Sequence, residues 1–225
     1  MNIQHGDAAE IKRAMVLLFR PGDVVEVRIP KTRCGVVSGY FDDHEALAKA
    51  IFSAESIYKA DGIYYTLNTI NPALLARACN RLKERAQHTT ADNDVVRRRW
   101  LPVDLDPVRP AGISSSDEEH AAAIERARLI ARDMAKEWGL PILGDSGNGA
   151  HLLYEIDLPG DETSLRFVSG ALASLDRRYS DKLVKIDISV ANASRIWKSY
   201  GTVARKGDAI PGRPHRVSKV LEVPI

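Results

Sequence analysis

The sequence predicts an α+β protein in which a four-stranded antiparallel sheet carries two helices on one face and follows a smaller αβ subdomain. Strand and helix patterns in the second half alternate in the order βαββαβ, the arrangement of a split βαβ unit. The dipeptide Asn148-Gly149 lies between the second and third of these strands and is the strongest signal for a two-residue hairpin. The usual spatial order of such strands is 4-1-3-2, which predicts that the first strand is central.

The composition is that of an ordinary globular protein. The 225 residues are 44% hydrophobic and 28% charged, enough for one large or two small domains with a core. A formal net charge of +2 does not indicate a basic coat for nucleic acid, so local charge matters more. No apolar run approaches a membrane span and no signal peptide is present, so we expect a cytoplasmic protein without a membrane partner. The two cysteines cannot form a four-ligand zinc site, so no zinc is expected.

Residues 1–96 predict the smaller N-terminal αβ subdomain. Capping residues begin two amphipathic helices, and Asn71-Pro72 is an N-cap with proline at the first helical position. Alternating apolar residues between the helices predict strands. The predicted helices cover 7–19, 42–59 and 72–85, the predicted strands cover 24–29, 35–40 and 62–68, and 89–94 is a loop.

Residues 97–225 predict the subdomain that contains the four-stranded sheet. Its first helix begins at the capping box Ser116 to Glu119 and ends before Gly139. The predicted strands cover 100–105, 141–144, 150–156 and 183–188, the predicted helices cover 116–138 and 163–179, and 159–162 is a loop.

Two aspartates, Asp104 and Asp106, stand two residues apart in the first strand. Residues i and i+2 share a face of a strand, so both carboxylates point away from the side of Val103 and Leu105. Neighbouring carboxylates repel each other unless a cation lies between them, and hard divalent ions prefer oxygen ligands. The alternative is a strand end that runs into a turn at Pro107.

The same alternation on the neighbouring strands places Asp187 and His151 on the face of Asp104 and Asp106. Each residue alone is equally compatible with a solvated surface position. Together, three carboxylates and a histidine on an open sheet face favour a two-metal phosphoryl-transfer site.

The run Ser146-Gly147-Asn148-Gly149-Ala150-His151 predicts a tight hairpin turn beside these carboxylates. Glycine-rich turns also expose backbone N–H groups that hold phosphate oxygens. The Ser146 hydroxyl and the His151 imidazole would add two further donors.

These three motifs resemble motifs I, II and III of the archaeo-eukaryotic primase superfamily, which includes primase-polymerases with an RRM-like (ferredoxin-like) catalytic sheet. The resemblance covers about residues 97–206. It implies that Asp104, Asp106 and Asp187 are catalytic and bind two divalent ions, Mg²⁺ or Mn²⁺. It also implies that the turn from Ser146 to His151 contacts the nucleoside triphosphate.

The segment from Asn192 to Thr202 resembles the stretch after motif III in phage- and plasmid-type members of the superfamily. This resemblance implies that Arg195 and Lys198 lie near the triphosphate, with Arg205 and Lys206 as less certain additions. Many members carry zinc-binding modules, for which this chain lacks the ligands.

Arg97, Arg98 and Arg99 precede the first strand and are candidates for binding nucleic acid, although a solvated face is an equal alternative. The resemblance implies a DNA primase-polymerase that uses ribo- or deoxynucleoside triphosphates on a single-stranded DNA template and primer. The strand-like end from Val217 to Ile225 suggests a piece of a larger replicative protein, with a helicase domain or replication or CRISPR-linked proteins as partners.

Two other classes of function remain open from the sequence. The first is a non-catalytic RRM-like module that binds single-stranded nucleic acid, although such modules expose aromatics rather than carboxylates on the central strands. The second is another two-metal palm-like enzyme, either a nucleotidyl cyclase or a nuclease.

Overall fold

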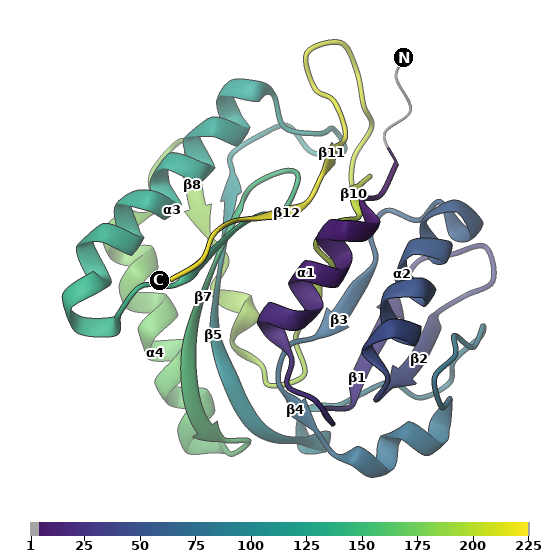
Figure 1. Cartoon of the computed structure of the whole chain (residues 1–225). Helices are drawn as coiled ribbons and strands as arrows, with labels where there is room; N and C mark the ends of the chain where they lie inside the picture. The colour runs from purple at the N-terminus through teal and green to yellow at the C-terminus, as the bar shows by residue number, and fades with distance from the viewer. Residues whose placement is uncertain (1–4, 225) are drawn as a thin grey trace.

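The structure is a computed structural model that describes residues 5–224. It contains two larger antiparallel sheets, of six and four strands, and a two-stranded antiparallel sheet over residues 203–204 and 216–217. Helices α1 (Ala8–Leu18) and α2 (His44–Tyr58) lie on one side of the molecule, and α3 (Asp117–Trp138) and α4 (Glu162–Tyr179) lie on the other (Figure 1). One cluster of buried apolar residues includes side chains from both halves of the chain.

The larger sheet confirms the predicted α+β unit and its strand order. Four of its strands follow one another in space as β8-β5-β7-β6, which is the 4-1-3-2 order, and all their pairings are antiparallel. Two further strands lengthen the sheet, one beside β6 and one beside the first half of β5. The strands are β4 (Thr69–Ile70), β5 (Val95–Pro107), β6 (Ile142–Asp145), β7 (Ala150–Pro159), β8 (Val184–Ile186) and β12 (Lys219–Glu222).

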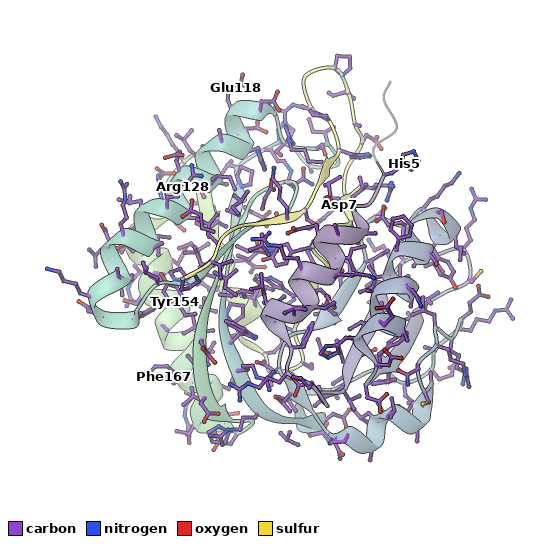
Figure 2. All side chains as sticks on the ribbon, viewed as in Figure 1. His5, Asp7, Glu118, Arg128, Tyr154 and Phe167 are labelled. Carbon is purple, nitrogen blue, oxygen red and sulfur yellow. The ribbon has the colours of Figure 1, made fainter. Side chains whose placement is uncertain are left out.

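The helices of this unit begin and end where the sequence predicts. Ser116 and Glu119 form a reciprocal capping box at the start of α3, and Gly139 ends the helix with φ 77°. Glu118 and Arg128 point outward from α3 (Figure 2). The ring of Tyr154 on β7 packs edge-on against the ring of Trp138, with ring centroids 5.2 Å apart. The alternation in β5 is confirmed, since Val103 and Leu105 are fully buried.

The smaller sheet draws its strands from both ends of the chain. The order is β2-β1-β3-β9, so a strand from the C-terminal half completes the N-terminal sheet. Strand pairing thus crosses the predicted division at residue 96/97 twice, through β9 with β3 and through β4 with β5. The division itself remains a prediction. The strands are β1 (Val25–Ile29), β2 (Val37–Phe41), β3 (Tyr64–Thr66) and β9 (Ile196–Lys198).

The predicted helix over 72–85 is wrong beyond Arg77. The chain forms a 3₁₀ helix only over Pro72–Arg77 (η1) and then runs beside the edge of β2. Its backbone groups are taken by that edge: Tyr40 N–H donates to the carbonyl of Ala78 at 3.1 Å, and Lys83 exchanges two hydrogen bonds with Ser38. The remaining short elements are η2 (Asp92–Asp94), η3 (Ile188–Ala191), β10 (Val203–Ala204) and β11 (Arg216–Val217).

Over residues 5–224, none of the helices combines the length and the apolar character needed to cross a membrane.

Candidate functional site

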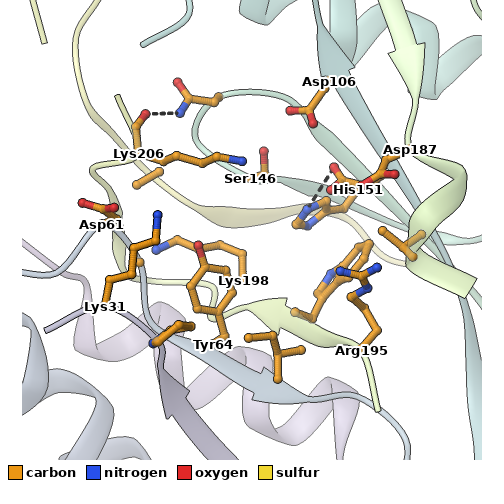
Figure 3. Close-up of a pocket in the computed structure, with 18 of the residues that line it drawn as sticks. Lys31, Asp61, Tyr64, Asp106, Ser146, His151, Asp187, Arg195, Lys198 and Lys206 are labelled. Carbon is orange, nitrogen blue, oxygen red and sulfur yellow. Dashed lines mark hydrogen bonds and ion pairs between the residues drawn. The ribbon is translucent and has the colours of Figure 1, made fainter. Parts of the chain in front are cut away.

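A cleft of about 360 Å³ lies between the two sheets. The carboxylates Asp106 and Asp187 lie at one end of it, and the amines of Lys31 and Lys206 lie at the other (Figure 3). A cleft of this size falls within the range that holds small-molecule ligands. The charged and hydroxyl side chains that line it are Lys31, Asp61, Tyr64, Asp104, Asp106, Arg109, Ser146, Asp187, Arg195, Lys198 and Lys206.

The three predicted aspartates all line this cleft. Asp104 and Asp106 come from the second half of β5, and the backbone N–H of Asp187 donates to the carbonyl of Asp104 at 2.9 Å. Asp187 differs from the prediction in its local structure, because β8 ends at Ile186. Asp187 instead caps η3, and its carboxylate accepts the N–H of Ser189 at 2.8 Å.

The charge on Asp104 is poorly compensated by the protein. Burial raises its pKa well above the usual range, and the neighbouring charges of Asp106 and Asp187 raise it further. A divalent cation would relieve both effects, so the chemistry of this donor set fits a metal ion. In the described part of the chain, however, no three acidic, histidine or cysteine side chains are arranged so that they could hold a metal ion together.

His151 lies beside Asp104, but the prediction that it stands on an open face is wrong. Its side chain is only 3% exposed, because Trp197 stacks on it with ring centroids 4.1 Å apart. Nδ1 lies 3.0 Å from the hydroxyl of Tyr200, and Nε2 lies 3.6 Å from Oδ1 of Asp104. Burial lowers the pKa of His151 to about 3, so the ring is neutral at pH 7 and offers hydrogen bonding rather than charge.

The hairpin between β6 and β7 is confirmed, but its turn has four residues rather than two. Asp145 pairs with Ala150, and the positive φ of 93° falls on Gly147 instead of Asn148. The backbone N–H groups of the turn are largely used within the hairpin. Ser146 N–H donates to the carbonyl of Gly149, Gly147 N–H to the Asp145 carboxylate, and Gly149 N–H to the Ser146 hydroxyl.

The N–H groups of Ser146, Gly147 and Gly149 therefore already have acceptors within the hairpin, and their contact with phosphate stays a prediction. The Ser146 hydroxyl accepts a hydrogen bond and keeps its own hydrogen to donate. Ser146 lines the cleft (Figure 3). Its hydroxyl is thus the donor that the turn offers to a ligand.

Asn148 braces the turn from inside the protein. Its side-chain oxygen accepts hydrogen bonds from the backbone of Ser115 at 3.0 Å and the hydroxyl of Ser114 at 3.1 Å. Its side-chain nitrogen donates to the carbonyl of Lys206 at 3.1 Å. Asn148 is only 6% exposed, so these contacts make it a positioning residue for Lys206.

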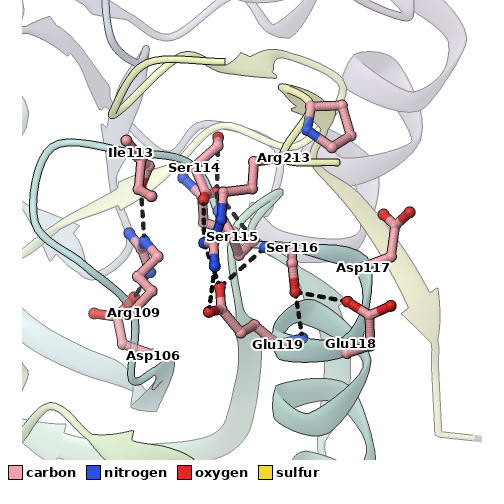
Figure 4. Close-up of polar contacts among 12 residues, drawn as sticks. Asp106, Arg109, Ile113, Ser114, Ser115, Ser116, Asp117, Glu118, Glu119 and Arg213 are labelled. Carbon is pink, nitrogen blue, oxygen red and sulfur yellow. Dashed lines mark hydrogen bonds and ion pairs between the residues drawn. The ribbon is translucent and has the colours of Figure 1, made fainter. Parts of the chain in front are cut away.

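The loop before α3 brings an arginine that the sequence analysis did not select. Arg109 lies 3.7 Å from the carboxylate of Asp106 and donates to the carbonyl of Ile113 at 3.2 Å (Figure 4). The same loop is fixed by Arg213, which forms two 2.7 Å hydrogen bonds with Glu119. The signal in the sequence that would have identified Arg109 is its position three residues after Asp106.

Lys198 is buried at the floor of the cleft. Its amine donates to the carbonyl of Val203 at 3.0 Å and lies 5.9 Å from the ring centroid of Tyr64. Burial lowers the pKa of Lys198 to about 7, although the nearby charge of Glu55 opposes this shift. Lys198 is therefore partly neutral near pH 7 until an anion favours its charged form.

The other predicted basic residues of the cleft are closer to solvent. Arg195 donates to the backbone carbonyl of Ser189, in the short helix that Asp187 caps. Lys206 follows β10 of the two-stranded sheet, Lys31 follows β1 of the four-stranded sheet, and both are exposed (Figure 3). Lys31 and Asp61 were not identified from the sequence, because nothing in the local pattern links them to Asp104 and Asp106, which lie more than 40 residues further along the chain.

Arg97, Arg98 and Arg99 lie on the first half of β5, and none of them lines the cleft. Arg98 is 3% exposed and donates to the carbonyl of Ala191 at 2.8 Å, so burial removes it from contact with nucleic acid. Arg99 is paired with Asp23, and Arg97 with Asp157.

The chain is similar in structure to a solved protein, but its sequence matches no family model and no curated sequence. The chain is similar to a structure described as "Crystal structure of primase RepB'", with 11% sequence identity and a TM-score of 0.49. The match covers 96% of this chain and 56% of that one. The function of this protein therefore rests on the residues of its cleft.

Proposed function

We propose that the protein is a template-directed nucleotidyltransferase, the catalytic core of a DNA primase-polymerase. The observation that carries this proposal is the composition of one cleft: three carboxylates lie at one end, and five basic side chains also line it. Carboxylates suit divalent ions, and lysine and arginine suit a triphosphate. The order of these residues along the chain also resembles the three primase motifs.

In this proposal Asp104, Asp106 and Asp187 hold Mg²⁺ or Mn²⁺. Divalent ions bound there supply activation of the attacking 3′-hydroxyl and stabilisation of the leaving pyrophosphate. The residues of the chain position the triphosphate: the amines of Lys198 and Lys206 neutralise its charge, and the hydroxyl of Ser146 donates a hydrogen bond. Pairing with a single-stranded template selects the base.

The face of the sheet favours an enzyme over a simple binding module. RRM-like modules stack bases on exposed aromatic side chains of the central strands. Here Asp104 and Asp106 occupy the central strand, and Trp197, which covers the neighbouring His151, is only 2% exposed. Neighbouring carboxylates repel phosphate unless a cation accompanies it.

The experiment is extension of a primed and an unprimed single-stranded DNA template with labelled nucleotides and Mn²⁺. We expect product from the wild type and none from Asp104→Ala or Asp187→Ala. Asp157→Ala is the matched control, because it removes a carboxylate of the same sheet outside the cleft. Undiminished product from the cleft variants would refute the site, whereas a cyclic nucleotide or a shortened template would identify a cyclase or a nuclease.

A further inference from the structure

One surface of the N-terminal half is strongly basic. We define the basic ridge as residues 30–36 and 77–88. It contains six of the 32 lysines and arginines and one of the 30 acidic residues of the chain. The ridge therefore has a formal charge of +5, whereas the rest of the chain has −3. Its basic residues are Lys31, Arg33, Arg77, Arg81, Lys83 and Arg85, and its acidic residue is Glu84.

The two segments of the ridge are joined by backbone hydrogen bonds. The backbone N–H of Arg85 donates to the carbonyl of Cys34 at 3.2 Å, and the backbone N–H of Ala86 donates to the carbonyl of Val36 at 2.9 Å. Gly39 of β2 permits this close packing, because a Cβ atom there would lie 2.1 Å from the carbonyl oxygen of Arg81. The basic side chains are thus held on an ordered backbone rather than on two independent loops.

The charges of the ridge are largely uncompensated. Among the described residues, Arg33, Lys83 and Arg85 are exposed and take part in no ion pair within 4.0 Å. Arg77 is the exception, since it lies 3.6 Å from Asp94. The one acidic side chain, Glu84, accepts a hydrogen bond from Tyr58. A polyanion would find these guanidinium and ammonium groups without having to displace a carboxylate.

The ridge begins inside the cleft and leads away from it. Lys31 lines the cleft, and the hairpin loop that contains Lys31 also contains Arg33. At the other end, Lys83 and His88 line a separate small pocket of about 190 Å³. A strand of nucleic acid that leaves the cleft beside Lys31 would therefore meet further positive charge at each step.

We propose that the basic ridge binds the phosphate backbone of a single-stranded nucleic acid that extends out of the cleft. This inference rests on the proposed function for the identity of the occupant, and on the charge and continuity of the ridge for its location. Binding would release the counterions that accompany the phosphates, so it would weaken as salt rises. A single strand follows a curved basic surface more readily than a stiff duplex does.

The test compares two triple variants of the full chain by fluorescence anisotropy, without nucleotide or metal. Arg33→Gln, Lys83→Gln and Arg85→Gln change the ridge. Arg132→Gln, Lys136→Gln and Arg177→Gln remove the same charge from exposed positions on α3 and α4. Each triple variant is titrated with three labelled nucleic acids over a range of salt concentrations: a single strand of about 16 nucleotides, a single strand of about 4 nucleotides and a duplex.

We expect the ridge variant to bind the longer strand about tenfold or more weakly and to lose about 2 from the slope of log K against log salt. The control variant and the short strand should change little. Equal losses in the two triple variants would overturn the location, and equal losses for duplex and single strand would overturn the identity of the partner. The assay does not require nucleotide transfer, so failure of the extension experiment is a separate result.

Discussion

Asp145 accepts the backbone N–H of Gly147 with a carboxylate oxygen at 2.6 Å, so the last residue of β6 holds the turn beside the cleft. The same oxygen lies 2.8 Å from Nε2 of His120 in α3. Asp145 is 4% exposed, and its removal would leave a buried donor without a partner. This geometry orders the effects of two substitutions.

Asp145→Ala should lower the free energy of unfolding by about 1–3 kcal/mol, because the buried N–H of Gly147 loses its acceptor. His120→Ala should cost less, about 0.5–1.5 kcal/mol, because the contact from Asp145 to Gly147 survives. Urea denaturation measures both. A larger loss for His120→Ala than for Asp145→Ala would show that the turn does not depend on Asp145.

Asn148→Ala should destabilise the protein by about 1–3 kcal/mol and weaken triphosphate binding. It removes the acceptor for Ser114 and Ser115, both fully buried, and it releases the backbone of Lys206. Asn148→Asp is the matched variant, because it keeps the acceptor oxygen but replaces the donor to Lys206 with a carboxylate oxygen and adds a buried negative charge. If Asn148→Asp binds nucleotide like the wild type, Asn148 does not position Lys206.

Gly149→Ala should disturb the strand of the two aspartates. A Cβ atom at Gly149 would lie 2.2 Å from the carbonyl oxygen of Leu105, which stands between Asp104 and Asp106. We expect a loss of about 1–3 kcal/mol and weaker Mn²⁺ binding. Gly170→Ala is the control: it lies in α4 with open space around it, and it should stabilise by about 0.5–1 kcal/mol. Calorimetry with Mn²⁺ titration would show the contrast, and normal Mn²⁺ affinity in Gly149→Ala would contradict it.

Lys198 predicts how stability depends on pH. Its folded pKa of about 7 lies below the ordinary value of 10.5, so the unfolded state binds more protons between these two values. Stability attributable to Lys198 should therefore rise from pH 7 to about pH 10, and below pH 7 the cost of burying the charge is fully present. Lys198→Met should flatten this rise in urea denaturation curves. Identical pH profiles for the two proteins would show that Lys198 is not buried as a free amine.

Local patterns predicted the βαββαβ unit because its signals lie within single elements. Alternation in β5 identified the buried face of Val103 and Leu105, and the capping box at Ser116 located the start of α3. The same kind of signal predicted the start of η1 at Asn71 but not its end. That end is set by hydrogen bonds with β2, more than 30 residues earlier in the chain.

The candidate site divides in the same way. Asp104, Asp106 and Asp187 were placed on one face by strand alternation, and all three line the cleft. The burial of His151 by Trp197 was not predictable, because it depends on the pairing of β9 with β3 in the four-stranded sheet. The glycine-rich pattern also does not reveal that the N–H of Gly147 in the turn donates to the Asp145 carboxylate.

The pairing of β9 with β3 has a mechanical consequence. The short helix η3 follows β8 of the six-stranded sheet. Only residues 192–195 lie between η3 and β9 of the four-stranded sheet. This link is itself pinned, since Asn68 donates to the carbonyl of Ala193 at 2.9 Å and Asp92 binds Ser194. A movement that separates the two sheets would therefore have to break the pairing of β9 with β3. We expect ligands to enter and leave the cleft without such a separation.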